Sequence, residues 1–293
     1  MQRVAGIPVG TSLPGNWVPE STTITRITTI WSPSEVAAIA QQQVRAIPVI
    51  GADDIRDVLP GFQLWDCWTI ESPQGATIVL DGWTPWVIMC APRDLHPDLR
   101  HDVARLRLML ERDGNWRDCG YLLPEHLNPG SREWAGSTVY DAASGRVTLF
   151  YTATGRRGNS ARSFEQRLFQ TTGKLEMTDG GMKVTGWSEP VESVAADGRT
   201  YMIVNQSIGE PGFIKGFRDP FHFRDPADGA DYLLFTASDA GATSTFNGVV
   251  GLARASGTGF AGWTLLPPLV SAVGVNNELE RPVLRTHGGR YYL

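Results

Sequence analysis

The stretch FQLWDCWTI, residues 62–70, places a carboxylate, Asp66, between two tryptophans in a run that otherwise has the composition of a buried strand. Burying a carboxylate is costly unless the group is hydrogen-bonded or paired. Aromatic rings beside a carboxylate suit a ligand with apolar C–H faces and hydroxyl edges, and sugars have this character. Asp66 is therefore the first candidate functional residue.

Two later stretches carry acids in similar surroundings, FRDP at 217–220 and NELERP at 277–282. Alone, each is more often structural, because Arg-Asp-Pro commonly forms a turn with a local ion pair. The two glutamates of ELE share one strand face, which is usually solvated, and a Trp-Asp pair in a strand is most often packing with a satisfied acid. Three such clusters, each beside an arginine or an aromatic residue, predict one carboxylate site assembled from separate strands.

The surrounding sequence predicts strands, because short apolar runs recur between turn signals such as Asp81-Gly82 and Asp113-Gly114. We expect strands at 76–80, 85–91, 103–111, 146–153, 201–204, 232–235 and 249–253. Many short strands with this spacing indicate an all-β sandwich, barrel or propeller. No strict repeat of about 40–45 residues is visible, so periodicity alone does not predict a propeller.

The first 50 residues are polar and irregular, and we expect residues 1–50 to wrap around a single catalytic domain at 51–293. One helix is predicted at 32–44, capped by Ser32 or Ser34. Its apolar stripe would comprise Val36, Ile39 and Ala40.

The composition narrows the function classes. A net charge of −5 argues against a nucleic-acid partner. No apolar run approaches the ~18 residues of a transmembrane helix, and the N-terminus lacks the apolar core of a signal peptide. The histidines match no metal or triad spacing and are interpreted as surface or satisfied core residues. The cysteines match no zinc site, allow at most one disulfide, and are interpreted as buried free thiols: Cys67, Cys90 and Cys119.

Four motifs together resemble glycoside hydrolase family 68, the levansucrases, inulosucrases and bacterial β-fructofuranosidases. They are WDCW (65–68), EWAGS (133–137), FRDP (217–220) and ELERP (278–282), in the family's order and approximate spacing. The resemblance implies an all-β, five-bladed β-propeller with its active site in a funnel on the central axis. It also implies a monomer that acts on sucrose and sugar acceptors, needs no cofactor, and is extracellular or periplasmic. Family members continue past this chain's last residue, so the last blade is expected to be incomplete.

The resemblance also implies roles for the acids. Sucrose would be cleaved with retention, which needs two carboxyl groups about 5–5.5 Å apart. On matching positions Asp66 is the nucleophile, Glu280 the acid/base, and Asp219 the transition-state stabiliser. Because an acid must hold a proton and a nucleophile must not, we expect a raised pKa for Glu280 and an ionised Asp66.

The other matching residues would bind substrate. Arg218 and Glu278 correspond to residues that grip the glucosyl unit and fructosyl hydroxyls, and Trp65 and Trp134 to the aromatic walls of the fructosyl pocket. Arg281 follows the acid/base and would tune it. FRDP occurs a second time at 223–226, where Asp225 is interpreted as a turn residue because a turn and a strand follow directly.

Several positions depart from the family's pattern. Asn277 and Phe213 stand where some members have aspartates that bind calcium, and a hard divalent cation needs several charged oxygens, so we expect no metal. Other departures favour a β-fructofuranosidase-like branch over a polymer-making levansucrase: Cys67, Ala135, Phe221 and Thr236.

Two alternatives remain open. One is a related five-bladed glycosidase acting on fructans or arabinosides, against which the EWAGS and Glu-x-Glu-Arg motifs argue. The other is a non-catalytic sugar-binding propeller or inactive fragment, against which the presence of all three acids argues.

Overall fold

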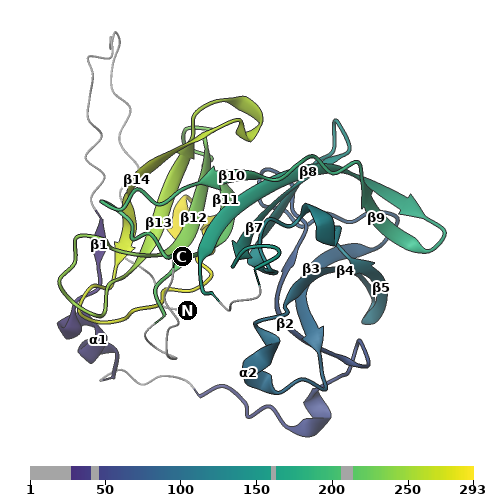
Figure 1. Cartoon of the computed structure of the whole chain (residues 1–293), viewed down its shortest axis with the longest axis horizontal. Coiled ribbons are helices and arrows are strands. Elements are labelled where there is room, and N and C mark those ends of the chain that lie inside the picture. The colour runs from purple at the N-terminus through teal and green to yellow at the C-terminus, as the bar shows by residue number, and fades with distance from the viewer. Residues whose placement is uncertain (1–27, 41–45, 160–162, 206–213) are drawn as a thin grey trace.

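The computed structural model describes residues 28–40, 46–159, 163–205 and 214–293. Within these ranges the protein is all-β, as the sequence predicts, with three large sheets and a separate hairpin (Figure 1). No helix among the described residues is long and apolar enough to span a membrane. The short helices are α1 (Pro33–Ala40) and α2 (Pro97–Arg100), with 3₁₀ turns η1 (Ala52–Asp54), η2 (Glu125–Leu127) and η3 (Thr258–Phe260).

Each large sheet is built mainly from antiparallel strands that follow one another along the chain. The first contains β2 (Phe62–Thr69), β3 (Thr84–Pro92), β4 (Arg105–Arg112) and β5 (Asn115–Tyr121). The second contains β6 (Arg132–Asp141), β7 (Arg146–Thr154), β8 (Gln166–Thr178), β9 (Gly181–Thr185) and β10 (Val191–Val194). The third contains β11 (Phe217–Arg224), β12 (Asp231–Ser238), β13 (Gly248–Ala255), β14 (Trp263–Ser271) and β1 (Thr29–Ile30), which pairs parallel to β14. The hairpin is β15 (Arg285–His287) and β16 (Arg290–Tyr292).

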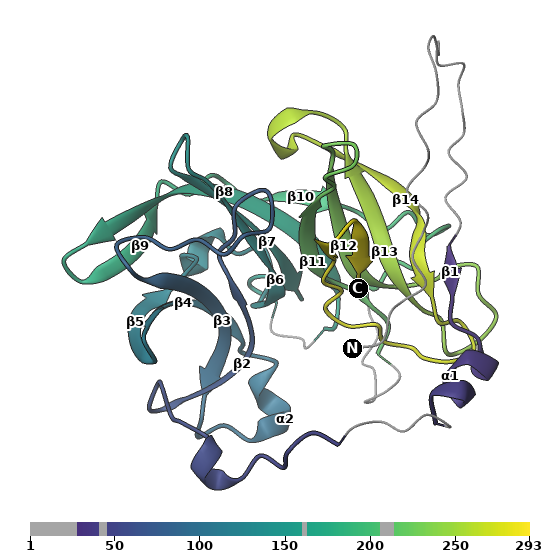
Figure 2. The same cartoon turned by 180° about the vertical axis from the view of Figure 1, so that it is seen from behind.

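The first and third sheets lie on either side of the second (Figure 2). Their first strands are linked by hydrogen bonds. Glu71, just after β2, donates its N–H to the Thr138 carbonyl on β6 at 3.0 Å. On the other side of β6, the Ser137 hydroxyl donates to the Pro220 carbonyl on β11 at 2.9 Å and accepts the His222 N–H at 3.0 Å. The first strand of each sheet therefore lies beside the first strand of the next.

Apolar side chains fill the two interfaces between the sheets. Because the middle strand β7 is buried on both faces, it reads as a near-continuous apolar run rather than an alternating one. Residues packed between the first and second sheets include Val87, Leu108, Leu149 and Tyr151. Those packed between the second and third include Phe150, Leu168, Phe217 and Phe235.

A β-bulge interrupts the first strand of every large sheet. The strand register shifts between Trp65 and Cys67 on β2, and the shift centres on Ala135 in β6 and on Asp219–Pro220 in β11. Asp66 and Asp219 have φ of 39° and 59°, a left-handed conformation that is uncommon for residues other than glycine. A bulge re-aims a side chain out of the regular alternation, so each carboxylate departs from the pattern of its strand.

Most of the predicted strands are confirmed, but two are wrong. Residues 76–80 and 201–204 make only isolated bridges, through Thr77, Leu80 and Tyr201. Residues 76–79 are irregular, with the Ile78 N–H bonded to the Ile70 carbonyl just after β2, and residues 80–83 form a tight turn. Instead, the Tyr201 side chain is buried against the third sheet. Its hydroxyl donates to the Leu266 carbonyl at 2.6 Å and accepts the Leu252 N–H at 3.0 Å.

The predicted helix near the N-terminus is present as α1, with Ser32 and Glu35 exchanging capping bonds; residues 41–45 lie outside the described ranges. Val36 and Ile39 of the predicted apolar stripe are exposed. Trp31 donates its N–H to the Ser271 carbonyl, so the described part of this segment lies along β14.

We expect Tyr201→Phe to destabilise the protein by about 1–3 kcal/mol, because it leaves a buried N–H and a carbonyl without their partner. Urea unfolding measures the loss. Tyr292→Phe, at an exposed position on β16, is the matched control and should leave stability unchanged. Equal stability of the two variants would contradict the role given to the Tyr201 hydroxyl.

Candidate active site

A buried arginine brings three carboxylates together. Arg218, on β11, is 4% exposed, and its Nη2 lies 2.7 Å from Glu278 Oε2 and 2.5 Å from Glu280 Oε1. Its Nε lies 3.6 Å from Oδ2 of the neighbouring Asp219. A charge buried this deeply is tolerated when it is paired and hydrogen-bonded. The second and third acidic motifs of the sequence therefore meet at one guanidinium.

A second arginine brings in the first motif. Arg281 donates from Nη1 to Asp66 Oδ1 at 3.1 Å and from Nη2 to the Cys67 carbonyl at 2.9 Å. Arg281 directly follows Glu280 and has a φ of 50°. Asp66 and Arg281 are 215 positions apart in the sequence. All of the acids predicted for the site are thus joined through two arginines.

Thr236 on β12 connects Asp219 to the segment that carries Glu280 and Arg281. Its fully buried Oγ1 lies 3.0 Å from Asp219 Oδ2 and 3.1 Å from the Leu279 carbonyl, and it accepts the Arg281 N–H at 3.1 Å. One hydroxyl proton serves two acceptors, so the carboxylate and the carbonyl share it. The sequence marked Thr236 only as a departure, because the connection depends on how β12 pairs with β11.

The predicted aromatic walls enclose a residue that the sequence reasoning missed. The His101 ring lies 5.3 Å from Trp65 and 6.3 Å from Trp134, centroid to centroid. Trp134 also donates from Nε1 to the His101 carbonyl at 3.0 Å. His101 is exposed at the end of α2, and its electrostatic interaction with Glu280 contributes to lowering the pKa of that glutamate. No spacing in the sequence indicates this position, because a loop of the first sheet carries it there.

Residues 21–249 and 239–293 match the sequence family described as Levansucrase/Invertase, glycoside hydrolase family 68. The chain belongs to this family.

Relatives and solved structures agree with the assignment. A levansucrase of Pseudomonas savastanoi pv. glycinea is 27% identical over 90% of this chain and 70% of its own length. An extracellular sucrase of Zymomonas mobilis is 30% identical over 85% of this chain and 64% of its own length. The structure of an inulosucrase from Halalkalicoccus jeotgali bound to kestose is 34% identical, with a TM-score of 0.79 over 90% of this chain and 67% of that one. Bacillus subtilis levansucrase, 16% identical with a TM-score of 0.74 over 90% of this chain and 71% of that one, shares the fold.

The pKa values of the clustered acids differ from one prediction. Burial raises the pKa of Asp219 to about 6, although Arg218 opposes this. Burial also raises the pKa of Glu278. For Glu280 burial acts in the same direction, but the hydrogen bond from Arg218 outweighs it and holds the pKa below its usual range. The predicted raised pKa of Glu280 is therefore wrong for this structure, since the sequence did not show that Arg218 would contact it.

The glutamate of the EWAGS motif is structural. Glu133 is fully buried, accepts the Leu106 N–H at 2.8 Å, and lies 3.5 Å from Arg105 Nε, so it ties β6 to β4. Burial raises its pKa to about 7, against the influence of Arg105. The glycine of the motif permits a close approach, because a Cβ on Gly136 would lie 1.9 Å from the Phe150 carbonyl oxygen.

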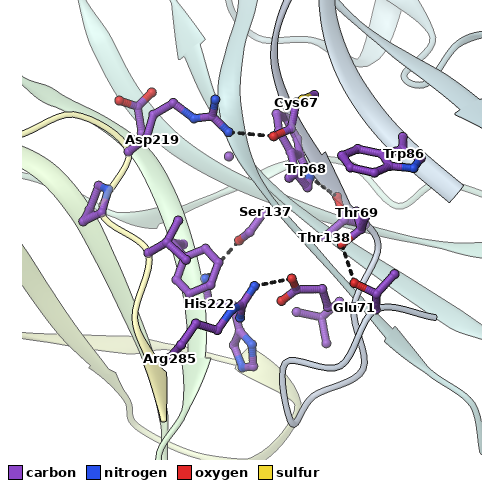
Figure 3. A pocket seen from close by; sticks show the side chains of 17 residues that line it. Cys67, Trp68, Thr69, Glu71, Trp86, Ser137, Thr138, Asp219, His222 and Arg285 are labelled. Atoms are coloured by element: carbon purple, nitrogen blue, oxygen red, sulfur yellow. Dashed lines mark hydrogen bonds and ion pairs between the residues drawn. The ribbon is translucent and has the colours of Figure 1, made fainter. Parts of the chain in front are cut away.

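A cavity of about 380 Å³ lies where β2, β6 and β11 meet (Figure 3). Asp219 borders it at one end, and an ion pair between Glu71 and Arg285 lies toward the other. Asp66 and Glu280 lie outside its lining. Cys67 also lines it and is exposed, which corrects its interpretation as a buried thiol.

Two structural interpretations are confirmed. His222 is a satisfied core residue, buried against Phe150 with its Nε2 2.7 Å from Asp231 Oδ1. Asp225, from the second FRDP, is a turn residue: its carbonyl accepts the Gly229 N–H at 2.8 Å.

The residues present do not fit the calcium ion that some family members hold. Asn277 Oδ1 accepts a hydrogen bond from Lys215 Nζ at 2.7 Å, so a positive charge already stands at this position. Phe213 lies outside the described residues. Among those that are described, no group of three histidines, cysteines or acids has the arrangement of a metal site.

The pKa of Asp219 yields a stability prediction. Its pKa rises from 3.8 in the unfolded chain to about 6, so the folded state binds this proton more tightly and loses stability as the pH rises between these values. Asp219→Asn removes that cost. We expect the variant to be more stable than the parent by about 1–3 kcal/mol at about pH 7.5, with the gain vanishing near pH 4.

Asp197→Asn is a control in which the expected change in stability has the opposite sign. Burial raises the pKa of Asp197, but the N–H groups of Tyr201, Arg199 and Thr200 outweigh it and lower the pKa to about 2. Its stabilisation is present above about pH 4 and is lost as the pH falls through about 2. This variant should therefore lose stability at about pH 7.5. Thermal unfolding across pH measures both, and a destabilised Asp219→Asn variant at neutral pH would contradict the prediction.

Proposed function

We propose that this protein is a retaining, sucrose-cleaving enzyme that forms a covalent fructosyl intermediate and passes the fructosyl group to water or a sugar acceptor. The observation that carries the proposal is the convergence of Asp66, Asp219 and Glu280 on Arg218 and Arg281. Family relatives named levansucrase, sucrase and inulosucrase support the substrate class.

The accessible acids would perform the covalent chemistry. The side chains of Asp66 and Glu280 are 36% and 57% exposed, whereas that of Asp219 is 8% exposed. Asp66 attacks the anomeric carbon of the fructosyl unit, and Glu280 gives its proton to the departing glucosyl oxygen. Glu280 then takes a proton from water or an acceptor hydroxyl as the new bond forms. Arg281 keeps the Asp66 carboxylate in place for attack.

The proton on Glu280 requires a change at Arg218. In the structure Arg218 Nη2 is shared between Glu278 and Glu280, which favours the ionised form of Glu280. Sugar hydroxyls that bind Arg218 and Glu278 would draw the guanidinium away. With the main opposing interaction removed, burial would raise the pKa of Glu280, so that substrate binding itself prepares the acid.

Asp219 would stabilise the transition state. Positive charge develops on the fructosyl ring as the glycosidic bond breaks, and a pre-placed carboxylate in a buried site stabilises that charge. Thr236 holds one carboxylate oxygen, and the Asp219 N–H donates to Thr152 Oγ1 at 2.9 Å. Trp65, His101 and Trp134 form the wall against which the sugar's C–H face would pack.

We also propose that the three sheets are blades of a five-bladed propeller around the axis where β2, β6 and β11 meet. In this arrangement the hairpin β15–β16 begins the fourth blade. We propose further that the protein acts as a monomer outside the cytoplasm; one relative is named an extracellular sucrase.

The first test measures sucrose turnover by two purified proteins. One is the 293-residue chain, and the other is the longer form encoded by the longest available reading frame. Asp66→Asn should lower glucose release by about 10⁴-fold or more, because the nucleophile is lost. Asp225→Asn, in the duplicate FRDP, is the control and should retain activity. The ratio of glucose to free fructose separates hydrolysis from transfer. Absence of glucose release from the longer form would exclude sucrose, and a panel of fructans and arabinosides would then test the alternative.

The second test concerns pH. Asp219 must be ionised, so kcat/KM should fall as the pH drops through about 6. Thr236→Val removes a hydroxyl that favours the ionised carboxylate, and we expect the acidic limb to move up by about one pH unit. Thr264→Val, at an exposed position on β14, should leave the limb unchanged. An acidic limb that does not move in Thr236→Val would contradict the role of Asp219.

A further inference from the structure

Lys215 holds an unusual position next to the site. It precedes β11, and its Nζ lies 2.5 Å from the Thr245 carbonyl, 2.6 Å from Asn247 Oδ1 and 2.7 Å from Asn277 Oδ1. Both asparagines are buried. Among the described residues, the oxygens that hydrogen-bond to Lys215 Nζ are all neutral, one carbonyl and two amide oxygens.

The hydrogen bonds show that the nitrogen is an ammonium. Asn247 donates from Nδ2 to the Asp239 carbonyl at 2.8 Å, and Asn277 donates from Nδ2 to the Ile214 carbonyl at 3.0 Å. These bonds orient both amides so that their oxygens face Lys215. A neutral amine has two N–H groups and cannot donate to three acceptors, whereas an ammonium can.

These bonds join the segments that carry the site. Lys215 leads into Arg218 and Asp219, and Asn277 leads into Glu278 and Glu280. From the β13 side, Gly248 donates its N–H to the Asn276 carbonyl at 2.9 Å. A Cβ on Gly248 would lie 2.7 Å from the carbonyl carbon of Asn277, so the two backbones touch.

We propose that Lys215 is a positioning residue, an internal cation that holds residues 277–280 against β11 and thereby sets Glu278 and Glu280 at Arg218. The ammonium donates to a cage of one carbonyl and two amide oxygens from two separate segments and so holds these segments together. The catalytic part of this inference rests on the proposed function, whereas the structural part does not.

Removal of the side chain should convert the cage into a cation site. Lys215→Ala leaves three converging oxygens with no positive charge between them, an arrangement that an ammonium ion can satisfy by donating hydrogen bonds. The added ion would then restore what the ammonium supplied. A residue that acts only by packing would not respond to cations in this way.

The test compares the parent, Lys215→Ala and Lys183→Ala, whose lysine is exposed on β9. Thermal unfolding is measured in tetramethylammonium chloride and in ammonium chloride at equal ionic strength. We expect Lys215→Ala to lose about 5–10 °C in tetramethylammonium chloride. Ammonium should restore at least half of this loss, while the parent and Lys183→Ala show no such salt-specific shift.

Sucrose turnover provides the second readout. In Lys215→Ala, kcat should fall about tenfold with KM within about twofold, and the cation that restores stability should restore kcat. A melting temperature equal to that of the parent, or a loss that no cation reverses, would overturn the proposal. If the parent itself releases no glucose, the proposed function fails while the unfolding measurements still decide the role of Lys215.

Lys215→Met covers the case in which Lys215→Ala does not fold. It keeps the aliphatic length, so the cage stays filled but uncharged, and cations cannot enter. We expect a lower melting temperature and a lower kcat that no added cation restores. A parent-like Lys215→Met variant would overturn the proposal as well.

Discussion

The buried guanidinium of Arg218 is the interaction on which the site depends. With 4% of its surface exposed, it requires carboxylates around it, and it takes them from its own strand and from residues 278–280. The same contact that gathers the acids also lowers the pKa of Glu280. If Glu280 is the acid, as we propose, assembly of the site and protonation of Glu280 are in conflict until a ligand competes for Arg218.

The bulges explain how otherwise regular strands direct Asp66 and Asp219 toward the site. All three first strands carry one at corresponding places, but the bulge of β6 holds Ala135, which has no chemistry. The bulge is thus a property of how the sheets meet at the axis, and carboxylates occupy it on two of the three strands. Positive φ at Asp66 and Asp219 is a local strain that the surrounding packing maintains.

The sequence predicted what local pattern and motif order can encode. Apolar runs between turn signals gave β3, β4, β7, β12 and β13, while 76–80 and 201–204 failed because composition cannot distinguish a strand from a packed irregular segment. The acids were found because their motifs are contiguous. His101, Thr236 and Lys215 were not assigned to the site, since each acts through partners that only the packing of separate sheets brings near.

Two cations flank residues 277–280, and their partners differ in a way that matters for reactivity. Arg218 faces carboxylates, whereas Lys215 faces a carbonyl and two amide oxygens. An aspartate at 277 in place of Asn277 would pair with Lys215 but add a negative charge beside Glu278, within a site that already concentrates four acids. Neutral oxygens let the ammonium hold the segment without adding another acid to that concentration, so the division of roles leaves Arg218 as the group that sets the charge state of Glu280.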